Sequence, residues 1–216
     1  MSLPFTHEQF LDAFGTYNSA LWPAVLALWL LTALALVLLA RDRANPRLVA
    51  ALLAIHWLWS GAVYHLGYFG AINPAARLFG ILFIVQACLF LWLGVLRPRF
   101  QVVWRGSHGV RGTLALFFTL YALAYPFLVL ATGLHWPRAP LFGVPCPTTL
   151  LTVGFLLLVE PGKLRGLSVI PAAWCFVAGS AALVLGVLPD LVLLFGGLVL
   201  LTQLFAPRLL ADARAA

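Results

Sequence analysis

The 216-residue sequence contains few charged residues, since Asp, Glu, Lys and Arg together make up only 9% of it. Soluble globular chains carry about a quarter charged residues and roughly half apolar ones or fewer. In this chain 63% of the residues are apolar. This composition excludes soluble α/β enzymes, disordered tails and small secreted domains held together by disulfides.

Two other scarcities exclude particular mechanisms. Lys163 is the only lysine and falls in an expected loop, so a retinal Schiff base inside a helix bundle is excluded. No carboxylate lies in the middle of an apolar run, because Glu160 and Asp190 fall at the ends of such runs. Ion-coupled pumps usually carry a buried acid as a relay, so binding or facilitated passage is favoured over pumping.

Long apolar runs are the main positive feature of the sequence. A helix needs about 20 apolar residues to cross a bilayer. The fifth run is short and follows Pro145 and Pro147, so a broken or re-entrant start is expected there. The sequence predicts an all-α, polytopic membrane protein with a single seven-transmembrane-helix domain over 22–206. The seven expected spans are 22–40, 48–66, 75–96, 113–134, 148–159, 167–188 and 191–206.

The charged loops predict an orientation. The net charge of +7 is concentrated in short loops, which is typical of the cytoplasmic side of a membrane protein, and no nucleic-acid partner is expected. Only Arg77 and Arg138 lie on the opposite side. We therefore expect the N-terminus outside, the tail 207–216 in the cytoplasm, and the cell (inner) membrane as the location. The other eleven cations are Arg41, Arg43, Arg47, Arg97, Arg99, Arg105, Arg111, Lys163, Arg165, Arg208 and Arg214.

The segment 1–21, ahead of the first run, is expected to form a short interfacial helix. Thr6 and Gln9 have the spacing of a capping box, and Phe10, Phe14 and Tyr17 recur at helical spacing. An amphipathic helix of this kind lies on the membrane surface. It serves either as an anchor or as a lid over a site that faces outward.

A weak internal repeat is also visible. Leu78-Phe79-Gly80 with Gln86 resembles Leu194-Phe195-Gly196 with Gln203, although the spacing differs by one residue. Such a repeat would give a parallel three-plus-one-plus-three arrangement. This arrangement is similar to that of small sugar facilitators, whose motifs are absent, so the likeness is an analogy of fold alone. Chance matches are common in so leucine-rich a chain.

The second run carries polar residues on one half of its expected helix. At 100° per residue, His56, Ser60, Tyr64, His65 and Tyr68 fall on the same half, and the other half is apolar. Polar residues within a membrane domain face the interior of the bundle. They either form a functional face or join helices through hydrogen bonds, which contribute about 1 kcal/mol or less each.

Polar residues of other runs are expected at the same outer level of the membrane. The third and fourth runs and the start of the fifth run contribute to this set. Tyrosines at that level also form interfacial belts without any binding role, which is the competing interpretation. The candidate ligand-binding residues are His56, Ser60, Tyr64, His65, Tyr68, Asn73, Gln86, Tyr121, Tyr125, Thr148 and Thr149.

Cys146 lies between two prolines, which keep its backbone out of a regular helix. A thiolate with nearby imidazoles suits soft metals such as Cu(I), Zn(II) or Hg(II). The candidate metal ligands are Cys146, His65 and His135, and the two histidines are the only outer-side pair available to a haem. Cys88 and Cys175 are expected to pack as small apolar residues. The cysteine spacing fits neither a zinc ribbon nor a thioredoxin-like motif.

Three groups of residues form a recognisable pattern. They are Phe5-Thr6, Phe10, Tyr17-Asn18 and Trp22-Pro23; Tyr64-His65, Ile72-Asn73-Pro74-Ala75-Ala76, Phe79-Gly80 and Gln86; and Pro145-Cys146-Pro147-Thr148-Thr149. The pattern resembles an uncharacterised bacterial family of multi-pass membrane proteins, a domain of unknown function. The resemblance covers most of the chain and implies no activity.

Three hypotheses about function follow from the sequence. The first is a membrane protein that binds, and passes, a small solute or metal ion through an outward-facing polar site. The second is a membrane-embedded oxidoreductase, or a protein that binds haem, quinone or metal, using Cys146 and the histidines. The third is an accessory subunit without a site of its own. The expected partners are the lipid bilayer and a small solute or ion, a homo-oligomer stays open, and an enzyme is the less favoured outcome.

Overall fold

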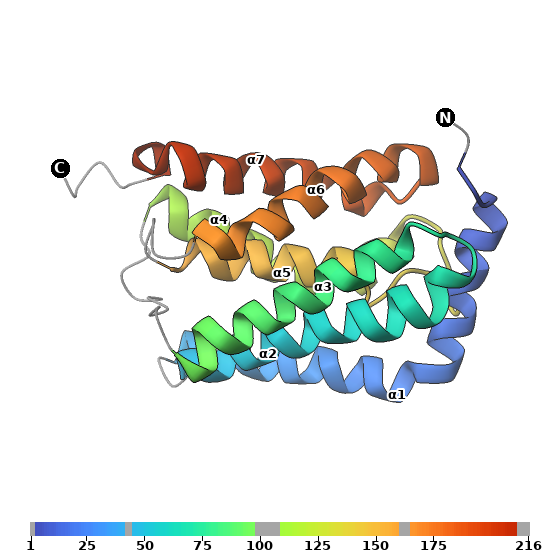
Figure 1. Ribbon diagram of the computed structural model, residues 1–216, viewed down its shortest axis with the longest axis horizontal. Coiled ribbons are helices and arrows are strands. Elements are labelled where there is room, and N and C mark those ends of the chain that lie inside the picture. The colour runs from blue at the N-terminus through green and yellow to red at the C-terminus, as the bar shows by residue number, and fades with distance from the viewer. Residues whose placement is uncertain (1–2, 42–44, 98–108, 160–164, 211–216) are drawn as a thin grey trace.

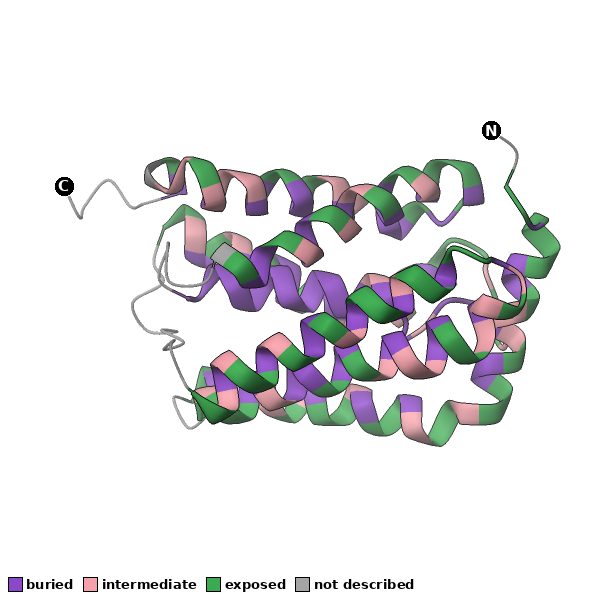
Figure 2. Ribbon diagram, in the orientation of Figure 1, coloured by how far each residue is buried: buried purple, intermediate pink, exposed green. Residues whose placement is uncertain are grey.

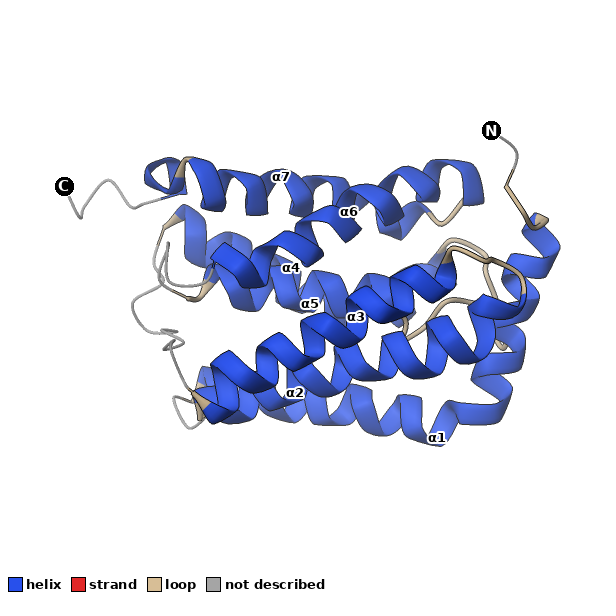
Figure 3. Cartoon of the chain, in the orientation of Figure 1, coloured by secondary structure: helices blue, strands red, loops and turns tan. Residues whose placement is uncertain are grey.

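The computed structural model describes residues 3–41, 45–97, 109–159 and 165–210, which form helices joined by loops and turns (Figure 3). The described residues contain no strand, and the all-α prediction is confirmed. The helical segments are α1 (His7–Ala40), α2 (Pro46–Leu58), η1 (Trp59–Tyr68), η2 (Phe69–Ala71), α3 (Ala76–Phe90), η3 (Leu91–Leu96), α4 (Val110–Ala131), α5 (Pro145–Leu157), α6 (Arg165–Leu185), η4 (Leu188–Leu191), α7 (Val192–Phe205) and η5 (Pro207–Leu210).

Six helices of the described chain are long and apolar enough to cross a membrane. The remaining α-helix, α5, has only 13 residues, which corresponds to about 20 Å against a hydrocarbon core of about 30 Å. Figure 1 shows the long helices packed side by side along the long axis of the molecule, with α5 among them. The six long helices are His7–Ala40, Pro46–Ala71, Ala76–Leu96, Val110–Ala131, Gly166–Leu185 and Leu188–Phe205.

The short helix α5 is enclosed by its neighbours. All of its residues are buried except Cys146, which is half-buried, and it contacts α2, α4, α6 and α7 (Figure 2). Gly154 allows the close approach of α4, because a Cβ atom there would lie 3.0 Å from the carbonyl oxygen of Ala115. Small residues are typical of interfaces where membrane helices pack closely.

The outer surface of the bundle is apolar too. Leu34, Ile81 and Leu183 are among the many large apolar side chains that are exposed there. Exposed apolar surface on this scale is typical of a membrane domain. Cys175 is buried as expected, whereas Cys88 is exposed on α3. Packing of Cys88 against other helices was therefore a wrong expectation, because an apolar side chain on the lipid-facing surface needs no protein partner.

The N-terminal segment and the first apolar run form one continuous helix, α1, of 34 residues. The predicted capping box is present, since the side chain of Thr6 accepts the N–H of Gln9 and the side chain of Gln9 accepts the N–H of Thr6. The first turns of α1 lie across the end of the bundle, and the helix then turns to run along it (Figure 1). Pro23 lies inside the helix, and proline is a common cause of such kinks.

Candidate functional site

A cavity of about 230 Å³ lies at the end of the bundle where α1 begins. Its walls come from α1 and the residues before it, from η1 and η2, and from the loop before α5 together with the first residues of α5. The second half of α6 and the turn before α7 complete them. Most of the lining is apolar, and much of it is aromatic. The polar and sulfur-bearing residues in the lining are Tyr64, His65, Asn73, Cys146 and Asp190.

Asp190 brings a buried carboxyl group to the cavity. Asp190 is only 6% exposed, and its Oδ1 accepts a hydrogen bond of 2.6 Å from the hydroxyl of Tyr125. Cys146 lines the same cavity as this carboxyl group. Among the ion pairs of the described residues, none includes Asp190. The described residues therefore supply a hydrogen bond to this carboxyl group without a cationic partner.

His65 faces the same cavity from η1. His65 is 1% exposed, and neither of its ring nitrogens has a hydrogen-bond partner in the part of the chain that the structure describes. Aromatic rings surround the imidazole, with centroids at 4.9 Å for Phe83 and 5.1 Å for Trp174. Buried polar groups are nearly always paired with protein, water or ligand. The imidazole of His65 is thus free to donate one hydrogen bond and accept another inside the cavity.

Aromatic side chains of the N-terminal segment close one side of the cavity. Phe5, Phe10 and Phe14 are all buried and line it. Phe5 packs against Phe69 at a centroid distance of 5.4 Å, and Phe14 stacks on Tyr64 at the same distance. These side chains thus form one wall of the cavity.

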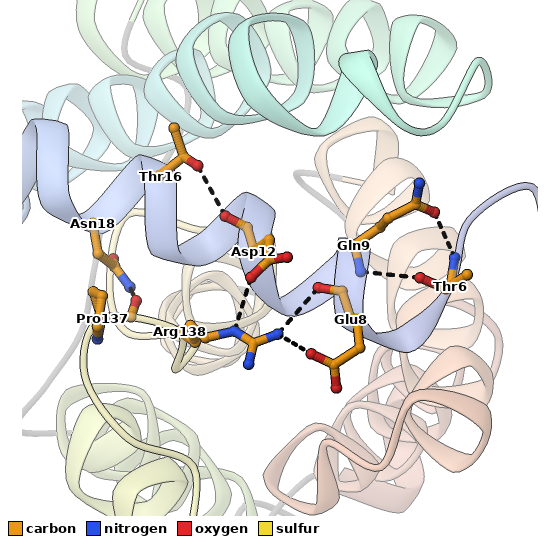
Figure 4. A network of polar contacts seen from close by, with 8 residues as sticks. All are labelled: Thr6, Glu8, Gln9, Asp12, Thr16, Asn18, Pro137 and Arg138. Carbon is orange, nitrogen blue, oxygen red and sulfur yellow. Dashed lines mark hydrogen bonds and ion pairs between the residues drawn. The ribbon is translucent and has the colours of Figure 1, made fainter.

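A group of ion pairs and hydrogen bonds holds the first turns of α1 in place (Figure 4). The guanidinium of Arg138, in the loop before α5, pairs with the carboxylates of Glu8 and Asp12. The side-chain amide of Asn18 donates to two carbonyl oxygens of the same loop, including that of Ala139 at 2.8 Å. These contacts join the cover of the cavity to the loop that leads into α5.

Several predicted polar residues instead hydrogen-bond within the helix bundle. The hydroxyl of Ser60 donates to the carbonyl oxygen of Gly143 at 3.1 Å and lies 3.1 Å from the hydroxyl of Thr148. Thr149 donates to the carbonyl of Pro145, one turn earlier. The contacts of Ser60 join η1 to the start of α5, whereas the bond of Thr149 stays within α5. Ser60, Thr148 and Thr149 do not line the cavity.

His56 is fully buried and lies away from the cavity. Its Nε2 is 2.8 Å from the hydroxyl oxygen of Thr32, and that hydroxyl donates to the carbonyl of Leu28. Because the threonine proton is already used, the imidazole nitrogen is the donor of this bond. Gln86 donates its amide to the carbonyl of Leu167. Both contacts join helices within the membrane domain.

The remaining predicted residues are spread around the same end of the bundle. Tyr121 donates to the carbonyl of Pro189 at 2.9 Å, one residue before Asp190. Tyr68 lines a separate, shallow groove together with residues of α1. His135 is exposed and does not line the cavity. Of the three candidate metal ligands, Cys146 and His65 share the cavity, and the described residues contain no group of three His, Cys, Asp or Glu that could hold a metal ion.

Comparison with known proteins places this architecture in a family. A family model, described as a family of unknown function (DUF6064), matches residues 7–215. The chain belongs to DUF6064. The match confirms the resemblance to an uncharacterised domain family. Neither the curated proteins nor the solved structures include a match to the chain.

In this DUF6064 chain, sequence reasoning missed Asp190 and Trp174 as parts of the site. Asp190 follows Pro189 at the edge of an apolar run, and such a position suggests an exposed loop. Its burial depends on the turn before α7, which packs against α6 and α4. The sequence did contain a signal for Asp190, because it is an ionisable residue beside an apolar run with no cation near it in the sequence. Such a residue is by default a functional candidate.

Proposed function

We propose that this protein is an integral membrane protein that binds a small solute in the cavity around His65, Cys146 and Asp190, and passes it across the membrane. The observation that carries the proposal is the combination in one cavity of a buried carboxyl group without a cation and a buried imidazole without any partner. Ligand sites are mostly apolar cavities with a few convergent polar groups.

The volume of the cavity limits the size of the solute. A cavity of about 150 Å³ in another protein accommodates benzene. At about 230 Å³, this cavity suits a molecule somewhat larger than benzene. The apolar lining favours a solute with an apolar body, and the polar residues favour one or two polar groups on it.

We further propose that the cavity opens to the outer side of the membrane. Cations at the ends of the described helices support this orientation: Arg41, Arg47, Arg97 and Arg111 lie at one end, while Arg77 and Arg138 lie at the end that holds the cavity. Lys and Arg gather on the cytoplasmic side. The proposal includes seven spans, with α5 as the short fifth one, and the inner membrane of the cell as the location.

Blocking the cavity tests whether it binds solutes. The probes are 2-phenylethylamine, 2-phenylethanol and phenylacetate, which share a benzene ring and differ in charge. Ala181 lines the cavity, so Ala181→Phe fills space without changing a polar group. Ala173 is exposed on the same helix, and Ala173→Phe is the matched control. Binding of any probe, measured by equilibrium dialysis, is expected to be lost in Ala181→Phe and kept in Ala173→Phe.

Uptake into proteoliposomes tests the second half of the proposal. A probe that binds is expected to enter vesicles that contain the unaltered protein faster than vesicles with Ala181→Phe. Binding with equal uptake by both would leave a binding protein and refute passage. If no probe binds to the unaltered protein, the proposed function itself is wrong.

A further inference from the structure

We propose that the solute is a cation, specifically a protonated amine on an apolar body, whose ammonium group lies against Asp190. The inference rests on the proposed function and names the class of solute that the same cavity accepts. It follows from the charges in the lining, from the hydrogen bond already made by Asp190, and from the aromatic rings around the remaining space.

Among the described residues, the lining carries one carboxyl group and no arginine or lysine. An anionic solute would meet a carboxylate in an apolar cavity with no cation to offset the repulsion. Repulsion and attraction between charges are much stronger there than in water. The cavity therefore favours a solute of positive charge over one of negative charge.

The hydrogen bond of Asp190 leaves room for such a group. An ionised carboxylate offers about four lone-pair positions, and the described structure fills one of them with the hydroxyl of Tyr125. A buried charge needs a partner of opposite sign as well as hydrogen bonds. An ammonium group from the solute supplies both at once.

His65 and the aromatic residues complete the recognition of an amine. A neutral imidazole accepts a hydrogen bond from an ammonium group through its unprotonated nitrogen, and both ring nitrogens of His65 are without partners. The faces of Trp, Tyr and Phe attract cations, and Phe10, Tyr64 and Trp174 all line the cavity. An apolar body attached to the amine packs against the same rings.

The experiment compares the three probes in the unaltered protein, by equilibrium dialysis near pH 7. At that pH the amine is protonated, phenylethanol is neutral and phenylacetate is negative. We expect 2-phenylethylamine to bind at least roughly ten-fold more tightly than phenylethanol, because a hydrogen bond between two charged groups is stronger than one from a neutral hydroxyl. Phenylacetate is expected to bind most weakly. This comparison needs no variant and so does not depend on whether a variant folds.

Asp190→Asn assigns the preference to a residue. The variant should lose the ten-fold advantage of the amine while it still binds phenylethanol. If phenylethanol or phenylacetate binds the unaltered protein as tightly as the amine, the cation inference is wrong and the binding function stands. If the amine keeps its advantage in Asp190→Asn, Asp190 is not its partner. If none of the probes binds, the proposed function falls together with the inference.

Discussion

Tyr125 and Tyr121 lie one turn apart on α4 and contact the residues before α7 in different ways. The hydroxyl of Tyr125 donates to the buried carboxyl group of Asp190, whereas that of Tyr121 donates to the backbone carbonyl of Pro189. Tyr125 is fully buried, and Tyr121 is half-buried. Tyr125 thus supports the carboxyl group of Asp190, whereas Tyr121 anchors only the backbone of the turn before α7.

Removing the two hydroxyls is expected to have unequal effects. Tyr125→Phe leaves a buried carboxyl group with one fewer donor, which costs about 1.5–3 kcal/mol. Tyr121→Phe removes a bond to a neutral carbonyl that lies nearer the surface, and a loss of about 0.5–1.5 kcal/mol is expected. Thermal unfolding of the purified variants in detergent measures the difference. Equal losses of stability would show that the bond from Tyr125 to the carboxyl group of Asp190 contributes no more than a bond to a neutral carbonyl.

The three cysteines differ in their surroundings and so provide a chemical test of access. Cys146 lines the cavity, Cys175 is buried among α6 and its neighbours, and Cys88 is exposed on the apolar outer surface. In intact cells, a small membrane-impermeant thiosulfonate reagent is expected to modify Cys146 alone, because lipid shields Cys88 and protein shields Cys175. Single-cysteine variants with mass spectrometry identify the product. Labelling of Cys88 without Cys146 would contradict an outward-facing cavity.

Part of the site was predictable at the scale of residues, for a geometric reason. Tyr64, His65, Asn73 and Cys146 were predicted at one level, and all four line the cavity. Alternate spans bring their ends to the same level, so depth can be read from the sequence. Which side chains point into the cavity cannot be read from the sequence. The burial of Asp190, for example, depends on how the turn before α7 packs.

The first turns of α1 are held over the cavity by an arginine from another element. Arg138 pairs with Glu8 and Asp12, and exposed ion pairs of this kind contribute little to stability. Such contacts are weak enough to open without unfolding the bundle. The arrangement suits a lid that admits the solute.

Arg138→Gln is therefore expected to raise the rate at which Cys146 reacts with the thiosulfonate reagent by roughly two- to ten-fold, because the ion pairs that hold the segment are lost. Arg77 is exposed at the same end and takes no part in the ion pairs found among the described residues. Arg77→Gln is thus the control, with an expected rate unchanged from that of the unaltered protein. Equal rates in all three proteins would favour a fixed surface anchor over a lid.

The contact between α4 and α5 depends on a glycine. A Cβ at Gly154 would collide with Thr119 and with the backbone of Ala115, whereas one at Gly166 would meet no atom within 4 Å. Gly154→Ala must move one helix away from the other, and overpacking of this kind costs about 1–3 kcal/mol. Gly166→Ala is expected to be neutral or slightly stabilising. Thermal unfolding of both variants in detergent checks the contrast.

At the scale of elements, the existence of helices was predictable and their internal geometry was not. Apolar runs fix where helices lie, but the second run continues beyond Leu58 as η1, a π-helical segment with wider turns. Successive side chains then advance by less than 100° per residue. Tyr68, predicted on the face of Tyr64, lines a different groove. The hydrophobic pattern alone does not reveal such a change.

At the scale of the whole molecule, α5 is the element on which the topology depends. It has 13 residues, too few to match the hydrocarbon thickness by itself. Its neighbours enclose it, however, and irregular backbone at membrane depth is tolerated where protein buries it. The loop from 141 to 144 extends it toward the cavity. Enclosure by the other helices thus compensates for a length that would be inadequate in contact with lipid.

Reporter fusions test this arrangement, and the decisive position is the segment 160–164 between α5 and α6. If α5 crosses the membrane, that segment is cytoplasmic, as its Lys163 favours. If α5 turns back, the segment is outside and the chain has six spans. We expect a fluorescent reporter to be active at 160–164 and after residue 210. Alkaline phosphatase is expected to be active at 72–75, where it serves as the outside control. Phosphatase activity at 160–164 would refute seven spans.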